Sequence, residues 1–320
     1  MNNSGTGRAG APVRASFARR IDIRAALKEG MARLRAVDVP SHTLAAELLL
    51  MHALGRDRAW LYSYPESLLE PAAAEKYFSL IARRAAGEPT QYLTGKQEFW
   101  GLEFEVTPAV LIPRPETEHV VEVALERLGP RGLKINMRTG APSPALRIAD
   151  VGTGSGCLAV ALAHELPHAE IFATDISAAA LEIARRNAAR HGVAERIHVL
   201  ETSLLQALLD ESHTFDLIVS NPPYVGRKEA AELPCEVFEH EPHSALFGGP
   251  SGVEMYAQLI EQAVALLRPR GILVLELGYK AARPVRAILD AQPAWARIAI
   301  TNDLAGIPRV LAAGRASSLD

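Results

Sequence analysis

The sequence is poor in cysteine, with only Cys157 and Cys235 among its 320 residues. Two cysteines support neither a disulfide framework nor a cysteine-based metal site. Cys157 directly follows a glycine-rich stretch, where we interpret it as a small buried thiol rather than a reactive one. Histidine does not replace cysteine as a metal ligand, because the histidines from residue 164 onward lack zinc-ligand spacing, and no metal is expected. These histidines are His164, His168, His191, His198, His213, His240 and His243.

Long apolar runs are missing as well. The longest strictly apolar run, Cys157–Ala163, is far too short to cross a bilayer. The N-terminus is rich in Gly, Ala and Arg and has no apolar segment of the signal-peptide kind, so residues 1–17 are predicted to be a disordered tail. These absences lead us to expect a cytoplasmic protein that does not contact a membrane.

Charge of one sign is not in excess. The net charge is −3, and 22% charged with 48% hydrophobic residues is ordinary for a globular protein. The first 95 residues carry 13 Lys and Arg against 9 Asp and Glu, a weakly basic balance that does not require a nucleic-acid partner. A chain of this length is expected to form two domains.

Residues 18–90 show the apolar spacing of helices and no strand-like alternation. Three stripes predict a small helical bundle, in which Ser41 caps the second helix and Pro71 opens the third. The stripes expected in its core are Ile23, Leu27, Met31 and Leu34, then Leu44, Leu48 and Met51, then Tyr77, Leu80 and Ile81.

Residues 91–112 turn to β-like alternation. Gly101 separates Phe99-Trp100 from the alternating run Leu102–Val106, which predicts a β-hairpin that links two domains. A helix from about Glu118 to Leu128 follows, and then a loop over roughly 129–145.

From Leu146 onward the chain alternates between strand, turn and helix. This alternation predicts an α/β, Rossmann-like fold over residues 113–315, with a parallel sheet and helices on both faces. Two strands between Trp295 and Ala312, with a turn near 303–307, would close the sheet. The expected strands are 146–151, 170–174, 197–201, 216–220 and 271–276, and the expected helices are 156–166, 177–191, 205–210 and 252–268.

A glycine-rich turn follows the first of these strands. Asp150 and Val151 lead into Gly152-Thr153-Gly154-Ser155-Gly156, where glycine lets the backbone pass close to a ligand. A dinucleotide-binding turn has the spacing G-x-G-x-x-G, which would put its last glycine at Cys157. The observed spacing D-x-G-x-G-x-G favours a nucleoside without pyrophosphate, above all S-adenosylmethionine.

The ends of the next two strands offer contacts to such a nucleoside. Asp175 follows the second strand about 20 residues after the glycine turn, where a carboxylate accepts hydrogen bonds from a ribose diol. Capping the next helix is the alternative role for Asp175, although Ser177 already offers a cap. After the third strand, Ser203 and Leu204 would contact adenine, or either would be plain loop or core.

The fourth strand ends in Ser220 and continues as Asn221-Pro222-Pro223-Tyr224. Two prolines remove backbone donors and stop the strand ladder, so this segment suits a site better than a sheet. The Asn221 side-chain oxygen and the Pro222 carbonyl would each accept a hydrogen bond from a planar NH2 group and stabilise positive charge developing on its nitrogen. Tyr224 would pack on the flat group and exclude water. A turn that merely ends the strand is the alternative, and no G-x-S-x-G turn or P-loop offers a competing chemistry.

Taken in order, these motifs give the chain a family resemblance. It resembles the bacterial release factor glutamine methyltransferases (PrmC or HemK-like) over residues 20–315. The motifs that carry the resemblance are Pro113-Arg114-Pro115-Glu116-Thr117-Glu118, Asp150–Gly156, Asp175, Asn221–Tyr224 and the loop Glu239–Gly249.

The resemblance implies a fold and a reaction. The fold is a helical N-terminal domain that recognises the substrate, a hairpin linker and a Rossmann-like class I methyltransferase domain with a seven-stranded, mostly parallel sheet. The reaction transfers a methyl group from S-adenosylmethionine to the side-chain amide nitrogen (N5) of the glutamine in the Gly-Gly-Gln loop of class 1 peptide chain release factors, and leaves S-adenosylhomocysteine.

The resemblance also implies site residues. Cofactor contacts fall on Gly152 to Gly156, Asp175, Leu204 and Asn221, and glutamine contacts fall on Asn221 to Tyr224. The corner at Ser203-Leu204 departs from the family, where Asp followed by an aromatic residue is common. Glu116 would either orient the amino-acid end of the cofactor or cap the helix that follows.

Other functions remain open on the same motifs. The N-P-P-Y segment also resembles that of a ribosomal protein glutamine methyltransferase, which usually lacks R-P-E-T-E, and that of adenine-N6 DNA methyltransferases. A DNA enzyme would be expected to add a target-recognition domain and a more basic surface. A third possibility is a cofactor-binding protein without catalysis. We expect a monomer that contacts a release factor and no nucleic acid.

Overall fold

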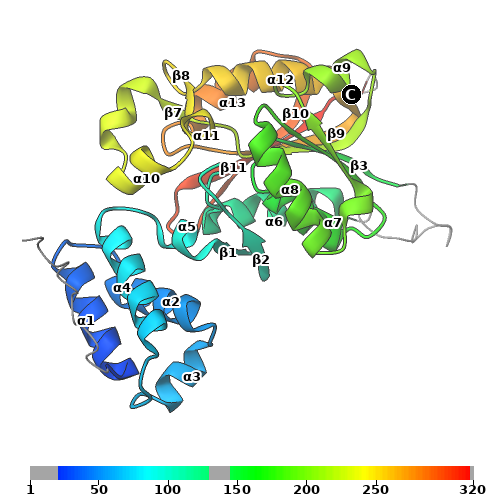
Figure 1. The fold of residues 1–320 in the computed structure, drawn as a ribbon. Helices are drawn as coiled ribbons and strands as arrows, with labels where there is room; N and C mark the ends of the chain where they lie inside the picture. The colour runs from blue at the N-terminus through cyan, green and yellow to red at the C-terminus, as the bar shows by residue number, and fades with distance from the viewer. Residues whose placement is uncertain (1–20, 130–144, 318–320) are drawn as a thin grey trace, which may run out of the picture. The chain divides into compact units, whose positions relative to one another are not determined.

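The computed structural model describes residues 21–129 and 145–317. The predicted tail 1–17 and nearly all of the predicted loop 129–145 lie outside the described residues. The chain divides into two compact units, Met1–Thr90 and Gln91–Asp320, and each is described by itself (Figure 1).

The described part of the first unit contains four helices: α1 (Ile23–Arg35), α2 (His42–Leu54), α3 (Arg58–Ser63) and α4 (Pro71–Ala85). α1, α2 and α4 pack against one another. The side chain of Asp22 caps α1, and that of Asp57 caps α3. Pro71 opens α4, as predicted. Gly30 makes a close crossing possible, because a Cβ at this position would overlap the Tyr77 hydroxyl of α4.

The second helix differs from its prediction. Within the described residues, Ser41 makes no side-chain capping bond and has a left-handed backbone (φ 51°), so the predicted cap was wrong. The predicted core stripe was also wrong, because Leu44 is 47% exposed. α2 is apolar nearly all round, so its sequence spacing does not select one face. The residues it buries are Ala45, Ala46, Glu47, Leu49 and Leu50.

A seven-stranded sheet organises the second unit, with the order β10-β11-β9-β6-β3-β4-β5. The five strands from β9 to β5 are parallel, and β11 and β10 close the sheet in antiparallel orientation. This arrangement confirms the predicted Rossmann-like fold. The strands are β3 (Arg147–Val151), β4 (Glu170–Asp175), β5 (Ile197–Glu201), β6 (Phe215–Ser220), β9 (Leu267–Glu276), β10 (Trp295–Asn302) and β11 (Pro308–Arg315).

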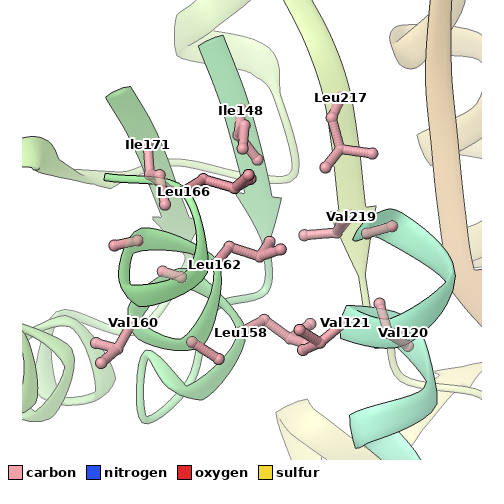
Figure 2. Packing of buried hydrophobic residues seen from close by; sticks show 14 of the residues in the cluster. Val120, Val121, Ile148, Leu158, Val160, Leu162, Leu166, Ile171, Leu217 and Val219 are labelled. Carbon is pink, nitrogen blue, oxygen red and sulfur yellow. The ribbon is translucent and has the colours of Figure 1, made fainter. Parts of the chain in front are cut away.

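Helices cover both faces of this sheet, because successive strand residues point to opposite sides. Ile148 and Leu217 pack with α6 (Glu118–Leu128) and α7 (Cys157–Glu165), as Figure 2 shows. Their neighbours Ala149 and Ile218 point the other way, into a second core. The helices of that second core are α9 (Gln206–Asp210), α12 (Glu254–Leu266) and α13 (Ala282–Asp290), of which α13 had no counterpart in the sequence prediction.

The chain order of the strands places a topological switch point at β3, at the edge of the sheet where the site residues lie. In the sheet, β4 and β5 lie on one side of β3, whereas β6 lies on the other side of β3. Ligands of open α/β sheets bind at such a switch point, beyond the carboxyl ends of the strands.

Shorter elements and one further helix complete the part of the second unit around the sheet. They are α8 (Ala178–Arg190), η1 (Pro115–Thr117), η3 (Ala194–Arg196), β7 (Val225–Gly226), η4 (Arg227–Glu232), α10 (Cys235–His240), α11 (His243–Leu246) and β8 (Phe247–Gly249).

After a short helix, α5 (Thr90–Thr94), the second unit begins with an antiparallel hairpin of β1 (Lys96–Phe99) and β2 (Leu102–Glu105). Trp100 and Gly101 form its two-residue turn, both with positive φ (56° and 70°), which is the conformation of tight hairpin turns. Ion pairs of Arg186 with Glu105 and of Arg190 with Glu103 attach the hairpin to α8.

No helix among residues 21–129 and 145–317 has both the length and the apolar character to cross a membrane.

Candidate active site

The glycine turn after β3 leaves room for a ligand. Gly152, Gly154 and Gly156 all have positive φ (70°, 54° and 81°), a conformation that glycine adopts without strain. A Cβ at Gly152 or Gly154 would meet no atom of the described chain within 4 Å. A Cβ at Gly156 would instead lie 3.2 Å from Ala184. The first two glycines therefore border open space, and the third lets α7 pack closely on α8.

The buried side chain of Asp150 holds this turn in place through hydrogen bonds. It is fully buried, and its Oδ2 accepts hydrogen bonds from Thr153 Oγ1 (2.6 Å) and from the Ala159 backbone N–H (3.1 Å). Its Oδ1 is also buried and has no hydrogen-bond partner among the described residues. Burial raises the pKa of Asp150 to about 7, and the nearby charge of Asp175 adds to the rise.

Asp175 lies where the second strand of the sequence prediction ends. Its Oδ2 accepts from the Gly154 backbone N–H (3.0 Å), and its Oδ1 accepts from the Ser177 N–H (2.9 Å). Each carboxylate oxygen keeps a further lone pair for a ligand. Ser177 caps α8 by accepting from the Ala180 N–H, as predicted, so the Asp175 side chain is not needed as the cap of this helix.

The corner after β5 has an unusual backbone. Leu204 has φ 51°, which costs a residue with a side chain about 1 kcal/mol or more. Its side chain is partly buried against the core that contains α9 and α12. Ser203 is exposed, and its carbonyl accepts from the Gln206 N–H (3.1 Å). An adenine contact at this corner stays a prediction.

Asn221 is fixed by two residues that the sequence reasoning did not single out. Its Nδ2 donates to Thr117 Oγ1 (3.1 Å), and the Thr117 hydroxyl donates to Glu276 Oε2 (2.6 Å). Thr117 and Glu276 are buried. R-P-E-T-E and N-P-P-Y, which the sequence treats as separate markers, therefore meet at one hydrogen bond. Finding Glu276 from sequence would have required knowing that β9 ends beside both.

Glycines line the N-P-P-Y segment. A Cβ at Gly248 would overlap the Pro223 carbonyl, and one at Gly252 would overlap the Tyr224 carbonyl. A Cβ at Gly278 would lie 2.7 Å from Cδ2 of the Tyr224 ring. The ring therefore rests directly on the backbone after β9. Burial raises the pKa of Tyr224 to about 12, so the phenol stays neutral and does not act as a base near neutral pH.

An ion pair between the partly exposed Arg114 and the buried Glu241 fixes the start of R-P-E-T-E. Arg114 pairs with Glu241, whose other oxygen accepts from the Ile112 backbone N–H (3.3 Å). Glu241 belongs to the loop Glu239–Gly249, and the end of this loop pairs as β8 with β7, directly after Tyr224. Three segments far apart in sequence thus support one another. Glu116 is exposed in η1, and its role stays a prediction.

A cavity of about 510 Å³ opens beside Tyr224. Its rim carries the ion pair between Lys280 and Glu229 (3.2 Å). The lining residues are Tyr224, Val225, Glu229, Glu232, Leu233, Ser251, Gly252, Val253, Gly278, Tyr279, Lys280, Ala281 and Pro284.

Asn187 of α8 joins the glycine turn to the hairpin, a link that the sequence did not suggest. Its Nδ2 donates to the carbonyls of Ser155 (2.9 Å) and Glu105 (3.0 Å), and its Oδ1 accepts from the Glu105 N–H (2.8 Å). The side chain is fully buried. The oxygen and the NH2 group of this buried amide are therefore both hydrogen-bonded, the NH2 group twice.

The residues at the carboxyl ends of β3 and β4 fit S-adenosylmethionine. The space beside Gly152 and Gly154 admits a ligand, and the carboxyl group of Asp175 bonds to the Gly154 backbone beside it. A carboxylate at this place opposes a pyrophosphate but suits a ribose diol and a positively charged ligand. The described residues contain no group of three or more His, Cys, Asp or Glu placed to hold a metal.

Comparisons with known proteins agree with this geometry. Residues 25–95 match the model of the PrmC N-terminal domain, and residues 137–249 match that of the methyltransferase small domain. The hMettl16 catalytic domain in complex with the MAT2A 3'UTR hairpin 6 has a similar fold (TM-score 0.52, 18% identity, 81% of this chain and 92% of that chain).

The fold, the matched methyltransferase domain and the curated relatives define a class I methyltransferase that uses S-adenosylmethionine. Curated relatives then narrow the class. The chain is 44% identical to the release factor glutamine methyltransferase of Koribacter versatilis, over 92% of this chain and 99% of the relative. It is also 44% identical to the enzyme of that name from Moorella thermoacetica, over 92% and 98%. The chain belongs to the release factor glutamine methyltransferase family.

Proposed function

We propose that this enzyme methylates N5 of the glutamine in the Gly-Gly-Gln loop of class 1 peptide chain release factors. The names of its relatives support the choice of substrate. The observation that carries the proposal is the hydrogen bond from Asn221 Nδ2 to Thr117, because it turns the amide oxygen of Asn221 away from Thr117 and leaves it available. An available amide oxygen beside a proline carbonyl is what a substrate NH2 group needs.

The chemistry follows from the poor nucleophilicity of an amide nitrogen, whose lone pair is delocalised. Asn221 Oδ1 and the Pro222 carbonyl accept the two N–H bonds, so the nitrogen can become tetrahedral with its lone pair aimed at the methyl group. The same two oxygens stabilise the positive charge that develops on nitrogen. Bound S-adenosylmethionine supplies the methyl group on an electrophilic sulfonium.

The remaining predicted residues hold and enclose the reactants. Gly152, Thr153, Gly154, Ser155 and Gly156 provide the backbone surface on which the cofactor lies. Asp175 accepts from the ribose, and Leu204 packs on the adenine. Pro223 and Tyr224 form the wall of the glutamine slot, and the raised pKa of Tyr224 keeps this wall uncharged. The nitrogen loses its proton after methyl transfer, so no strong base is needed before attack.

The first unit is proposed to recognise the release factor. A cavity of about 1030 Å³ opens along α1 and reaches α2 and α3. Its floor is apolar, with Leu27 and Leu61 buried, and its edge carries the exposed cations Arg24, Lys28 and Arg35. A surface of this composition suits a protein partner that presents apolar side chains ringed by acids. The domain boundaries follow the same proposal: 18–90 recognises, 91–112 links and 113–315 transfers the methyl group.

The proposal extends to the surroundings of the enzyme. We place it in the cytoplasm, where release factors act on the ribosome, as a monomer that binds the release factor and no nucleic acid.

Methyl transfer from labelled S-adenosylmethionine to a release factor tests the proposal. Label should appear in the wild-type release factor and not in a variant whose Gly-Gly-Gln glutamine is changed to Ala. Mass spectrometry should place one methyl group on that glutamine. Labelling that persists in the Ala variant would overturn the proposal, and labelled DNA or ribosomal protein would redirect it to the related activities.

A further inference from the structure

The side-chain amide of Asn221 has two possible orientations. An asparagine amide can rotate by 180°, which exchanges its oxygen and its nitrogen with little change in shape. Only one of the two orientations offers Oδ1 to a substrate NH2 group. The residue that selects the orientation is therefore as important to the reaction as Asn221.

Thr117 makes this selection because of where its own proton goes. Its hydroxyl has one proton, and it donates that proton to Glu276 Oε2 at 2.6 Å. Toward Asn221 it can then only accept, so it must meet Nδ2, as observed at 3.1 Å. We propose that Glu276 and Thr117 are positioning residues which turn Asn221 Oδ1 toward the substrate amide, and that they do so only while Glu276 Oε2 carries no proton. This inference rests on the proposed function of Asn221.

Protonation of Glu276 would reverse the direction of these hydrogen bonds. When the added proton is on Oε2, Glu276 donates to Thr117, whose own proton must then find another acceptor. The Asn221 amide oxygen can accept it after a 180° rotation of the amide. If the amide does not rotate, the Thr117 proton is left buried without a partner, which costs about 1–3 kcal/mol. In either case the arrangement that receives the substrate NH2 group is lost.

The surroundings of Glu276 make this protonation accessible near neutral pH. Glu276 is 1% exposed, and burial raises its pKa to about 7. The hydrogen bond from Thr117 and the charges of Arg309 and Arg114 act in the opposite direction, and the charge of Glu116 adds to the rise. The other ionisable groups that sense Glu276 are Tyr224, Tyr256 and Cys157, all of which stay neutral at this pH.

Two variants separate this role from a merely structural one. Glu276→Gln offers Thr117 either an amide oxygen or an amide N–H but cannot gain a proton, so the orientation of Asn221 no longer changes with pH. Thr117→Val removes the link and leaves Asn221 unselected at every pH, whereas Thr117→Ser restores the hydroxyl. Ser220→Ala is the matched control, because Ser220 loses a different buried hydrogen bond, to the Val151 carbonyl (2.7 Å), next to Asn221.

The experiment measures the single-turnover rate of release factor methylation from pH 5.5 to 9 at saturating S-adenosylmethionine. The wild-type rate should rise about tenfold per pH unit below about 7 and then level off. Glu276→Gln and Thr117→Val should both lose this rise. At pH 8 the Thr117→Val rate should fall about tenfold or more, and Thr117→Ser should recover most of it. Cofactor affinity, measured by calorimetry, should change little in any variant.

Two results would overturn the inference: an unchanged acid limb in both variants, or a Thr117→Val rate no lower than that of Ser220→Ala. If Glu276→Gln does not fold, the Thr117 pair decides the question alone. Failure of the proposed function looks different, because the wild-type enzyme would then leave the glutamine unmethylated at every pH.

Discussion

The side-chain amide of Asn187 donates a 2.9 Å hydrogen bond to the backbone carbonyl of Ser155, inside the glycine turn. The same amide makes two further bonds to the backbone of Glu105 in the hairpin. One buried side chain of α8 thus links the glycine turn to the hairpin that follows the helical unit in sequence.

Replacing Asn187 by Leu should loosen the glycine turn. The variant keeps the volume of the side chain but leaves three backbone groups without their partner, each costing about 1–3 kcal/mol. We expect S-adenosylmethionine affinity to fall about tenfold or more by calorimetry, with a lower melting temperature. Arg186→Ala is the control, because it removes the ion pair to Glu105 and leaves Ser155 untouched. Equal cofactor affinity in the two variants would contradict the expected role of Asn187.

Replacing Asn221 by Ala should separate catalysis from cofactor binding. The substrate NH2 group loses one of its two acceptors, and loss of such a preorganised partner lowers rates by about 100-fold or more. The proposed role of Asn221 is directed at the substrate amide, so the dissociation constant for S-adenosylmethionine should change by about threefold or less. Parallel single-turnover kinetics and calorimetry measure both. A variant that loses cofactor affinity as much as rate would argue against a catalytic Asn221.

Replacing Gly278 by Ala should displace Tyr224. The added Cβ would lie 2.7 Å from the ring, so the ring or the end of β9 must move. Overpacking of this kind costs about 1–3 kcal/mol of stability. We expect the methylation rate to fall about tenfold or more while cofactor affinity is kept. Gly314→Ala on β11 is the control, because its Cβ would meet the Ala296 carbonyl at an ordinary 3.4 Å. Equal rates in the two variants would show that the position of Tyr224 does not matter.

The free energy of unfolding should fall as the pH rises from 5.5 to 8. Burial raises the pKa values of Asp150 and Glu276 to about 7 in the folded chain, above their ordinary values of 3.8 and 4.5. The folded state therefore binds these protons more tightly, and its advantage is lost as the pH passes 7. Urea unfolding at the two pH values measures the change, which should be about 1 kcal/mol or more. Asp150→Asn and Glu276→Gln should each flatten the dependence. A dependence that both variants retain in full must come from other groups.

Charge reversal at the cavity along α1 should weaken substrate recognition alone. Lys28→Glu places an acid among the exposed cations that line this cavity. We expect KM for the release factor to rise about tenfold, with kcat and cofactor affinity unchanged, because α1 belongs to the helical unit. Lys76→Glu, on α4 and outside the residues that line the cavity, is the control. An equal rise in KM for both variants would point to the net charge of the unit rather than to this surface.

Much of the fold could be read from local pattern. Alternating apolar runs locate the strands of the sheet, and Pro71 marks the start of α4 because proline suits a first helical turn. Asp303, in the predicted turn, donates its N–H to the Ile307 carbonyl (2.8 Å) between β10 and β11. Each of these signals depends only on neighbours in the chain.

Local pattern failed where a segment was apolar on every side. In α2, Leu44 and Leu49 are equally suitable for a core by their chemistry, and packing against α1 and α4 selects Leu49. Ser41 was expected to cap this helix by residue type, but its left-handed backbone prevents the capping geometry. The tertiary fold made both choices.

The sequence by itself determined that a glycine turn, Asp175 and N-P-P-Y follow the first, second and fourth predicted strands, and hence that they share one edge of a parallel sheet. It could not determine that Thr117 and Glu276 lie against Asn221, since these residues are more than 50 positions away from it along the chain. Only the tertiary structure brings η1 and the end of β9 together beside β6. The physical reason is that hydrogen bonding depends on distance in space, and the fold, rather than the local sequence, decides which partners are within reach of the Asn221 amide.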